Sequence, residues 1–342
     1  MEVFAKMPEI DKQAYYEFSA DKKGLPKHII EKDFWVCWTL KQLFALPDIG
    51  EQLIFKGGTS LSKAYHLIKR FSEDIDISID KKYLGFIGER DPEGVSSNKK
   101  QQILIRELAD TCSCFVQNKL KEELYSQFSR ELNSTKMNWH LDIDTVDVDR
   151  QTLLFYYPTL SPKTNDTYVR SIVKIEFGAR GAKDPYNICN ISPFMMEEIA
   201  DSKIMSSVKI KTLAAERTFW EKATILHMYA NWPTNKIVPL RQSRHFFDFY
   251  KLLQSDIKTH AMDDLNLLKR VAEHKKIYFR AGWANYENAK EGSLTLIPPD
   301  AILHALENDY RQMKEMFYGH AISWSEIILQ IKNFQSAFNN RD

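Results

Sequence analysis

Long apolar runs are missing from this 342-residue sequence. A helix that crosses a bilayer needs roughly 20 consecutive apolar residues, whereas the most apolar early segment, residues 34–40, is short and flanked by charges. Residues 1–6 also lack the apolar centre of a secretory signal peptide. We therefore expect no membrane segment and a cytoplasmic location.

Cysteine, glycine and proline are also scarce. The four cysteines are too few for a disulfide scaffold in a chain of this length, and Cys112-x-Cys114 has no histidine or second cysteine pair nearby to complete a zinc site. The 12 glycines and 12 prolines exclude fibrous and linker-like proteins. We therefore expect four reduced thiols in an ordinary folded protein.

A surplus of charge of one sign is absent too. The sequence has 47 Lys and Arg against 46 Asp and Glu, a formal net charge of +1. This balance excludes an acidic solvating chain and a uniformly basic coat for nucleic acid.

What is present is the composition of a globular protein, with 44% hydrophobic and 27% charged residues. At about 150 residues per domain, the length favours two domains. Strand-like and helical patterns are mixed up to residue 212, and helical patterns follow almost to the end. We therefore predict an α+β fold, with a mixed β-sheet and flanking helices in residues 1–212 and a helical bundle in residues 213–342.

Hydrophobic periodicity gives the expected elements. The sequence predicts two helices within residues 10–46 and further helices from Thr59 to about Lys69, at 99–132, 213–231, 241–255, 258–281, 299–317 and 323–339. It predicts strands at 53–55, 74–80, 139–144, 152–157 and 168–177, with weaker signals near 186–191 and 206–210. Residues 82–98 read as a loop.

The sharpest feature lies within residues 53–80. A short apolar strand enters the Gly-Gly-Thr-Ser segment at residues 57–60, and the next strand carries Asp74-x-Asp76. Glycines let the backbone approach a ligand closely, and N–H groups at a helix start suit phosphate oxygens. Carboxylates two residues apart on a strand project from one face, and such ligands suit Mg²⁺ bound to nucleotide phosphates.

Each part of this feature has a plainer interpretation when it is taken alone. The glycine pair can be a simple turn, and the two aspartates can belong to a solvated strand face. Their order, strand, Gly-Gly, helix and Asp-x-Asp strand, favours phosphate and metal chemistry instead. The segment is not a Walker P-loop, because the G-x-x-x-x-G-K spacing is absent and Lys63 follows no such glycine.

The same residues resemble the signature of the DNA-polymerase-β-like nucleotidyltransferase superfamily, and more specifically of the AbiEii/AbiGii toxin family. The resemblance spans about residues 50–255. It is carried by the blocks at residues 57–61 (GGTSL), 70–76 (RFSEDID), 152–158 (TLLFYYP), 174–180 (KIEFGAR), 217–227 (RTFWEKATILH) and 244–248 (RHFFD).

The resemblance implies metal-dependent transfer of a nucleoside monophosphate (NMP) from NTP to an acceptor, with release of pyrophosphate. Members of the family act as toxins of bacterial toxin–antitoxin or phage-defence pairs, and some modify the acceptor end of tRNA. The implied cofactor is Mg²⁺ or Mn²⁺. The implied partners are NTP, an RNA acceptor such as tRNA, and a cognate antitoxin protein.

The superfamily uses three carboxylates, and the resemblance places the first two at Asp74 and Asp76. For the third, spacing alone favours Asp142 or Asp144 as much as Glu176. The family pattern puts the third acid in the strand before Gly-Ala-Arg, which selects Glu176. By this resemblance Asp74 and Asp76 bind two metal ions, and Glu176 binds the ion that activates the acceptor hydroxyl.

The resemblance also implies site residues in the second domain. Composition alone leaves Lys222 on a helix surface, but the family pattern makes it an active-site cation, with Asp248 orienting it or contacting nucleotide. Arg244 and Asp248 are i, i+4 and have a plainer interpretation as a helix ion pair. The implied catalytic residues are Asp74, Asp76, Glu176, Lys222 and Asp248; the implied nucleotide-binding residues are Lys56, Gly57, Gly58, Thr59, Ser60, Lys222 and Arg244.

The near-zero net charge hides one basic stretch. Residues 203–280 carry 15 basic against 7 acidic side chains, which favours either solvated helix faces or a cationic wall for triphosphate and RNA. Three functional hypotheses remain: transfer to RNA, transfer to a protein or small molecule, and a non-catalytic nucleotide-binding partner of an antitoxin.

Overall fold

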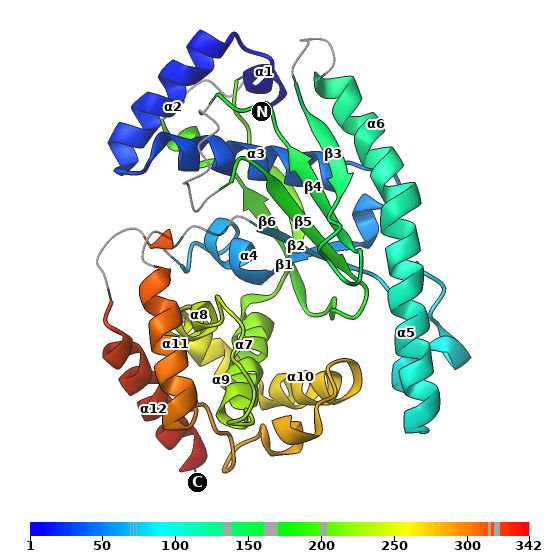
Figure 1. The fold of residues 1–342 in the computed structure, drawn as a ribbon, viewed down its shortest axis with the longest axis vertical. Helices are drawn as coiled ribbons and strands as arrows, with labels where there is room; N and C mark the ends of the chain where they lie inside the picture. The colour runs from blue at the N-terminus through cyan, green and yellow to red at the C-terminus, as the bar shows by residue number, and fades with distance from the viewer. Residues whose placement is uncertain are drawn as a thin grey trace. The chain divides into compact units, whose positions relative to one another are not determined.

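A computed structural model describes residues 1–68, 70, 72, 74–132, 138–160, 170–198, 204–313, 316–317 and 322–341. Figure 1 shows the chain as a ribbon. It divides into two compact units: residues 1–64 with 71–212, and residues 65–70 with 213–342. None of the described helices is long and apolar enough to cross a membrane.

The first unit contains a seven-stranded sheet and its flanking helices. Its strands are β1 (Leu53–Lys56), β2 (Asp74–Ile79), β3 (His140–Ile143), β4 (Thr152–Tyr156), β5 (Val173–Gly178), β6 (Tyr186–Ile191) and β7 (Val208–Leu213). Its helices are α1 (Glu2–Ala5), α2 (Glu9–Lys23), α3 (Lys27–Phe44), α4 (Gly57–Lys63), α5 (Asn98–Phe115) and α6 (Lys121–Leu132), with a π-helical segment, Val116–Leu120, between α5 and α6.

The strand order in this sheet is β3-β4-β5-β2-β1-β7-β6. β2 runs parallel to β5 and antiparallel to β1, so the sheet is mixed and the predicted α+β fold is confirmed. The alternation that predicted β2 has a direct cause. Ile75 and Ile77 are buried on one side of the strand, whereas Asp74 and Asp76 on the other side are only half-buried.

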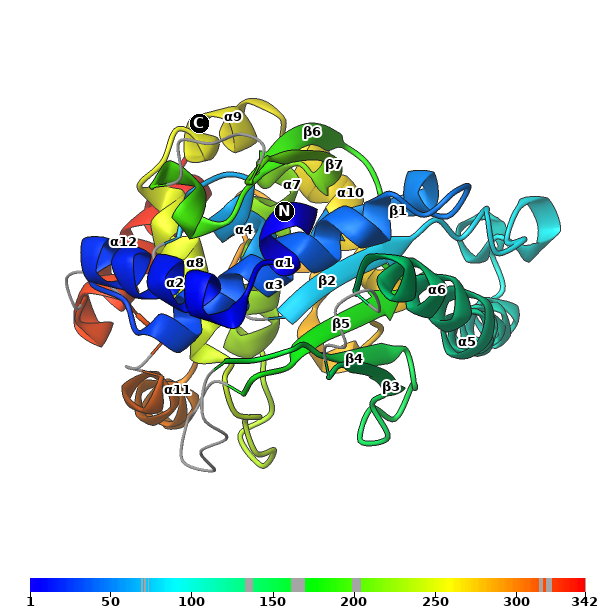
Figure 2. The same ribbon diagram turned by 90° about the horizontal axis from the view of Figure 1, so that it is seen from above.

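The apolar run at residues 34–40 forms the middle of α3, which packs on the sheet. Trp35 and Trp38 are fully buried, and their rings lie 5.9 and 5.8 Å from the ring of Phe155 in β4. Phe128 of α6 contacts Phe155 at 4.6 Å, so α3 and α6 both lie against the β4 region (Figure 2). Burying such side chains stabilises the fold by roughly 2–3 kcal/mol each, which fixes β4 against the helices.

A buried ion pair ties α4, the helix of the Gly-Gly motif, to α3. Asp33 of α3 and Lys63 at the end of α4 form this pair, with 1% and 6% of their side chains exposed. Asp33 also accepts a 2.6 Å hydrogen bond from the N–H of Phe194, and the Lys63 ammonium lies 3.4 Å from the Phe194 ring centre. Burial raises the pKa of Asp33 although Lys63 opposes the shift. The pair therefore holds α4 against α3.

The expected helix start at Thr59 is wrong in detail. α4 begins two residues earlier, at Gly57, and ends at Lys63, while Lys69 lies outside the described residues. Thr59 is an internal residue whose hydroxyl donates to the backbone carbonyl of Asp74 instead of capping the helix. The glycine at the first helical position has φ +81°, which a side chain rarely allows and which the cap prediction did not anticipate.

Other elements also differ from the sequence prediction, among them one strand and one helix. The strand expected from residue 168 begins at Val173, and its first expected residues, up to 169, are not among those described. The helix expected over 258–281 is split into α9 (Ile257–Asp263) and α10 (Leu265–Tyr278). Asp264 causes this break, because its side chain accepts a hydrogen bond from the Leu267 N–H and caps α10.

The second unit is built from helices around an aromatic core. Phe219 contacts Trp220, Phe249 and Phe334, with ring centres 4.9, 4.9 and 5.7 Å away. Its α-helices are α7 (Ala215–Ala230), α8 (Ser243–Leu253), α9, α10, α11 (Asp300–Gln312) and α12 (Trp324–Asn339).

Residues 65–70 precede β2 in the chain, yet they belong to the second unit. The Tyr65 hydroxyl donates a 2.9 Å hydrogen bond to the carbonyl of Leu213, and Arg70 forms an antiparallel bridge with Phe317. The Arg70 guanidinium binds Asp248 of α8. The sequence pattern does not predict this membership, because each contact joins residues far apart in the chain.

Candidate active site

Three acidic side chains share one face of the sheet at its centre. In the parallel pair β2–β5, Asp76 lies opposite Glu176 and Asp74 lies opposite Lys174. Residues opposite one another in adjacent strands point to the same side, about 4.8 Å apart. Asp74, Asp76 and Glu176 therefore project from the same face of neighbouring strands.

The alternative third carboxylates lie farther from Asp76. Asp142 is on β3 and Asp144 follows it, and β3 is separated from β2 by both β4 and β5. Three strand spacings amount to about 14 Å, against a single spacing for Glu176. The structure thus places Glu176 directly beside Asp76. Asp142 and Asp144 do not lie on a strand next to β2.

Lys56 continues the same row on the other side of β2. It is the last residue of β1 and lies opposite Asp76 in the antiparallel pair β1–β2. Lys56, Asp76 and Glu176 therefore form one row across three strands, with a cation at one end. A lysine in this position can neutralise phosphate oxygens next to the carboxylates.

A lysine also sits among the carboxylates. The Lys174 ammonium lies 2.6 Å from Glu176 and 4.0 Å from Asp144. Burial opposes the charge on Lys174, but the hydrogen bond that it donates to Glu176 and the charges of Glu176, Asp74 and Asp144 raise the pKa of Lys174 above its usual value. The acidic side chains around Lys174 therefore favour a positive charge at this position on the face.

The donor chemistry fits a divalent metal ion. As the side chains are placed, no three His, Cys, Asp or Glu residues within the described ranges stand close enough to hold one ion. The carboxylates of Asp74, Asp76 and Glu176 nevertheless supply, from adjacent positions, the oxygen ligands that Mg²⁺ and Mn²⁺ prefer. An ion bound at Glu176 would compete with Lys174 for the same carboxylate.

Gly57 leaves the space that the Asp76 carboxylate occupies. A Cβ atom built on Gly57 would lie 1.9 Å from Oδ2 of Asp76 and 2.6 Å from its carboxyl carbon. The carboxylate of Asp76 thus rests against the start of α4, in space that any side chain at position 57 would fill. Glycine is required there for this contact as well as for the positive φ.

We expect Gly57→Ala to impair the site more than the fold. The positive φ alone costs about 1 kcal/mol for alanine, and the clash also pushes the Asp76 carboxylate out of place. A displacement of about 1 Å in a catalytic group can lower the rate about a hundredfold. The measurement is NMP transfer together with chemical denaturation.

Gly24→Ala is the matched control for this variant. Gly24 has φ +63° at the end of α2, and a Cβ there would meet no atom within 4 Å. The control therefore carries the backbone strain without the clash, and it should lose stability but retain activity. Equal activity in the two variants would contradict the role given to Gly57.

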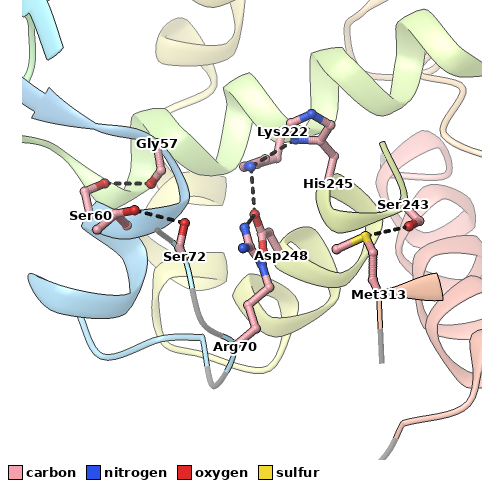
Figure 3. Close-up of polar contacts among 10 residues, drawn as sticks. Gly57, Ser60, Arg70, Ser72, Lys222, Ser243, His245, Asp248 and Met313 are labelled. Atoms are coloured by element: carbon pink, nitrogen blue, oxygen red, sulfur yellow. Dashed lines mark hydrogen bonds and ion pairs between the residues drawn. The ribbon is translucent and has the colours of Figure 1, made fainter. Parts of the chain in front are cut away.

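The hydroxyls of the Gly-Gly-Thr-Ser segment form hydrogen bonds with other residues of the protein. Thr59 and Ser60 are fully buried. Thr59 is hydrogen-bonded to Ser72 at 2.9 Å as well as to the Asp74 carbonyl, and Ser60 donates to the Gly57 carbonyl at 2.8 Å (Figure 3). Both hydroxyls stabilise α4 and its link to β2, so binding of nucleotide by the hydroxyls of Thr59 and Ser60 would require them to exchange these partners.

The second unit holds a separate buried cluster centred on Asp248 (Figure 3). Arg70 donates two hydrogen bonds to the Asp248 carboxylate, from Nε to Oδ1 at 2.7 Å and from Nη2 to Oδ2 at 2.9 Å. Lys222 of α7 lies 2.8 Å from Oδ2. Lys222 also lies 3.1 Å from Nδ1 of His245.

Charge and burial set the protonation states in this cluster. Burial opposes ionisation of Asp248, but Arg70 and Lys222 hold its pKa well below the usual value. Burial lowers the pKa of Lys222, against the pull of Asp248. Burial and the charge of Lys222 lower the pKa of His245 well below its usual value, so His245 is neutral and its Nδ1 accepts from the Lys222 ammonium. Two buried cations thus share one carboxylate, leaving a net positive charge.

The helix ion pair between Arg244 and Asp248 is not formed. In the described part of the chain, Asp248 is bound by Arg70 and Lys222, and Nε of Arg244 is buried without a hydrogen-bond partner. Sequence reasoning missed Arg70, although it opens one of the blocks that carry the family resemblance. Only its contact with α8, 178 positions away, identifies it as the partner of Asp248.

The start of α8 is fixed by Asp309 of α11. Asp309 accepts hydrogen bonds from the N–H and the hydroxyl of Ser243, at 2.8 and 2.6 Å. The Ser243 hydroxyl also contacts the sulfur of Met313 at 3.2 Å (Figure 3). These contacts satisfy the free backbone group at the helix start and so position His245 and Asp248, which lie within about the first one and a half turns of α8.

A family model described as "Nucleotidyl transferase AbiEii toxin, Type IV TA system" matches residues 38–340. Among solved structures, the chain is similar to MenT4, a nucleotidyltransferase toxin from Mycobacterium tuberculosis H37Rv, with 15% identity and a TM-score of 0.45 over 95% of this chain and 99% of that chain. No curated protein matches the chain.

The family match, which covers most of the sequence, shows that the chain belongs to the AbiEii family of nucleotidyltransferase toxins, which are components of type IV toxin–antitoxin systems. The predicted family and the predicted enzyme class are confirmed by this match.

Proposed function

We propose that this toxin transfers NMP from NTP to the acceptor end of tRNA in a Mg²⁺- or Mn²⁺-dependent reaction. The observation that carries the proposal is the register of β2 and β5, which puts Asp76 opposite Glu176 with Asp74 on the same face. The family to which the chain belongs supports the reaction type and a cognate antitoxin as partner. The cytoplasm, where NTP and tRNA are both present, is the proposed location.

The proposed reaction is a single displacement at the α-phosphorus of NTP. An oxygen of the acceptor hydroxyl forms a bond to phosphorus, and the bond from phosphorus to the α,β-bridging oxygen breaks. Pyrophosphate leaves with the bonding electrons, and the hydroxyl proton passes to a carboxylate or water. Such transfers require alignment and charge neutralisation more than covalent help.

Asp74, Asp76 and Glu176 are the residues proposed to hold the divalent ion. When bound, such an ion supplies positive charge to the transferring phosphoryl group and lowers the pKa of a coordinated hydroxyl. Glu176 and Asp76, on adjacent strands, orient the acceptor oxygen and the α-phosphate relative to one another. Lys174 then exchanges its contact with Glu176 for the neighbouring acidic side chains.

Cationic residues are proposed to bind the triphosphate. Lys56 ends the row that contains Asp76, and Gly57 and Gly58 at the start of α4 leave the backbone open to a close approach. Lys222 and Arg244 are proposed to balance the phosphate charge in the same reaction, and Asp248 to position Lys222. Support for these three residues comes from their chemistry and from family membership, since the Asp248 cluster retains a surplus of positive charge.

The test of this function compares acceptor classes. The purified chain is incubated with Mg²⁺ and each NTP labelled in its α-phosphate, together with pooled tRNA, cell protein or an aminoglycoside. We expect label in tRNA that is absent without Mg²⁺ and absent with Asp76→Ala.

Other outcomes identify the alternatives. Label confined to protein or to the aminoglycoside would overturn the tRNA assignment while leaving nucleotidyl transfer in place. NTP binding measured by calorimetry, with no pyrophosphate released in the presence of any acceptor, would instead indicate a non-catalytic nucleotide-binding protein.

A further inference from the structure

An open stack of two rings lies on β3 and β4. His140 and Tyr156 are opposite one another in the antiparallel pair β3–β4. Their rings are nearly parallel, with centres 3.9 Å apart and planes 13° from parallel. The His140 side chain is 55% exposed, and Nε2 of His140 lies 3.6 Å from the Asp142 carboxylate. This stack is therefore a half-open planar surface and not part of the aromatic core.

The stack lies on the carboxylate face of the sheet. Thr152 of β4 is opposite Glu176, so Tyr156, four residues further along the same strand, points to the same side as Glu176. From Asp74, Tyr156 is displaced by two strands and by two residues, about 10 Å across the strands and about 7 Å along them. This separation is comparable with the reach of one or two nucleotides.

A cavity of about 660 Å³ opens beside the stack. His140 and Tyr156 line one part of it, and Lys6, Pro8 and Lys12 at the start of the chain line another. Lys6 pairs with Glu131 at 3.1 Å, and Lys12 donates to the Ala5 carbonyl at 3.3 Å. The volume is that of a ligand pocket for a nucleotide-sized group, and an aromatic surface beside it suits a stacked base.

We propose that the His140–Tyr156 stack is a platform on which a base near the acceptor end of single-stranded RNA stacks. The proposal rests on the proposed function, which assigns NTP to α4 and Lys56. Along the sheet, α4 follows β1 on one side of β2, whereas β5, β4 and β3 lie on the other. In-line displacement requires the attacking hydroxyl to enter opposite the leaving pyrophosphate. A base stacked on β4 is therefore part of the acceptor and not of the NTP.

The test measures RNA binding separately from transfer. The affinity for a short fluorescein-labelled single-stranded RNA is measured by anisotropy, and NTP affinity is measured by calorimetry. We expect Tyr156→Ala to weaken RNA binding about tenfold or more, as expected for loss of base stacking, with NTP affinity unchanged. Tyr156→Phe keeps the ring and should bind RNA almost as well as the wild type.

Two further variants provide a control and an independent test of the platform. Tyr186→Ala removes a tyrosine that is 44% exposed on β6, at the opposite edge of the sheet, and should leave RNA affinity unchanged. His140→Ala removes the outer ring from an exposed position, so it tests the platform even if Tyr156→Ala does not fold. We expect it to weaken RNA binding in the same direction.

The outcomes separate the platform from the proposed reaction. If folded Tyr156→Ala and His140→Ala bind RNA as tightly as the wild type, or if the wild type binds no RNA, the platform is excluded. A loss of NTP affinity in place of RNA affinity would also overturn it. Labelled tRNA with no sensitivity to these variants rejects the platform alone, whereas RNA binding that depends on Tyr156 without tRNA labelling rejects the proposed reaction alone.

Discussion

Asp76→Asn is expected to lower NMP transfer about a thousandfold or more while leaving the fold intact. The substitution preserves shape but removes the charge and one hard oxygen ligand from the row shared with Glu176. Loss of about 4 kcal/mol of charge stabilisation is typical for such a group and corresponds to about three powers of ten in rate. The measurement is single-turnover transfer at saturating NTP and Mg²⁺.

Asp142→Asn is the matched control for this prediction. Asp142 belongs to the second Asp-x-Asp pair, but it lies on β3, three strands from β2. Transfer by this variant should stay close to that of the wild type. If Asp142→Asn loses as much activity as Asp76→Asn, or if Asp76→Asn retains full activity, the assignment of the site to β2 and β5 is wrong.

Asp248→Asn is expected to destabilise the second unit by about 3–5 kcal/mol. The carboxylate is fully buried and neutralises both Arg70 and Lys222, so its loss leaves two buried cations without a counter-charge. Removing one partner of a buried pair typically costs this much. Chemical denaturation followed by tryptophan fluorescence measures the loss, because Trp220 lies in the same unit.

Lys222→Met separates stability from activity within the same cluster. The two hydrogen bonds between Arg70 and Asp248 remain, and a lysine whose burial lowers its pKa is removed. The free energy of unfolding should therefore stay the same or rise slightly, whereas transfer falls about a hundredfold or more if Lys222 neutralises phosphate. Full activity in a stable Lys222→Met protein would exclude that role.

The acid dependence of stability offers a second readout for Asp248. Its pKa is lower in the folded than in the unfolded chain, where the usual value is 3.8. Its contribution to stability is therefore fully present above about pH 4 and is lost as the pH falls toward the folded pKa. The free energy of unfolding of Asp248→Asn should therefore fall less with acid than that of the wild type, because the contribution from Asp248 is already absent.

The sequence predicts those parts of the site that depend on local patterns. The alternation of residues 74–80 predicts β2 and shows that Asp74 and Asp76 share a face, since the side chains of a strand alternate with period two. The choice between Glu176 and Asp142 depends on strand order, which spacing does not contain. The register of β2 with β5 makes Glu176 the neighbour of Asp76, in the position that the family pattern selects.

Features that depend on long-range contacts are not predictable from the pattern. Arg70 reads as an ordinary basic residue until its contact with Asp248 is known. Thr59 has the residue type of a helix cap, but a buried hydrogen bond to the Asp74 carbonyl takes its hydroxyl. The His140–Tyr156 stack likewise requires the pairing of β3 with β4.

The central claim is that the carboxylates of β2 and β5 bind the divalent ion of nucleotidyl transfer. The most direct measurement is a titration of Mn²⁺, followed by electron paramagnetic resonance, in the presence of NTP and without an acceptor. We expect Asp76→Asn and Glu176→Gln each to weaken Mn²⁺ binding about tenfold or more, with Asp142→Asn equal to the wild type. Equal Mn²⁺ affinity in all four proteins would contradict the claim.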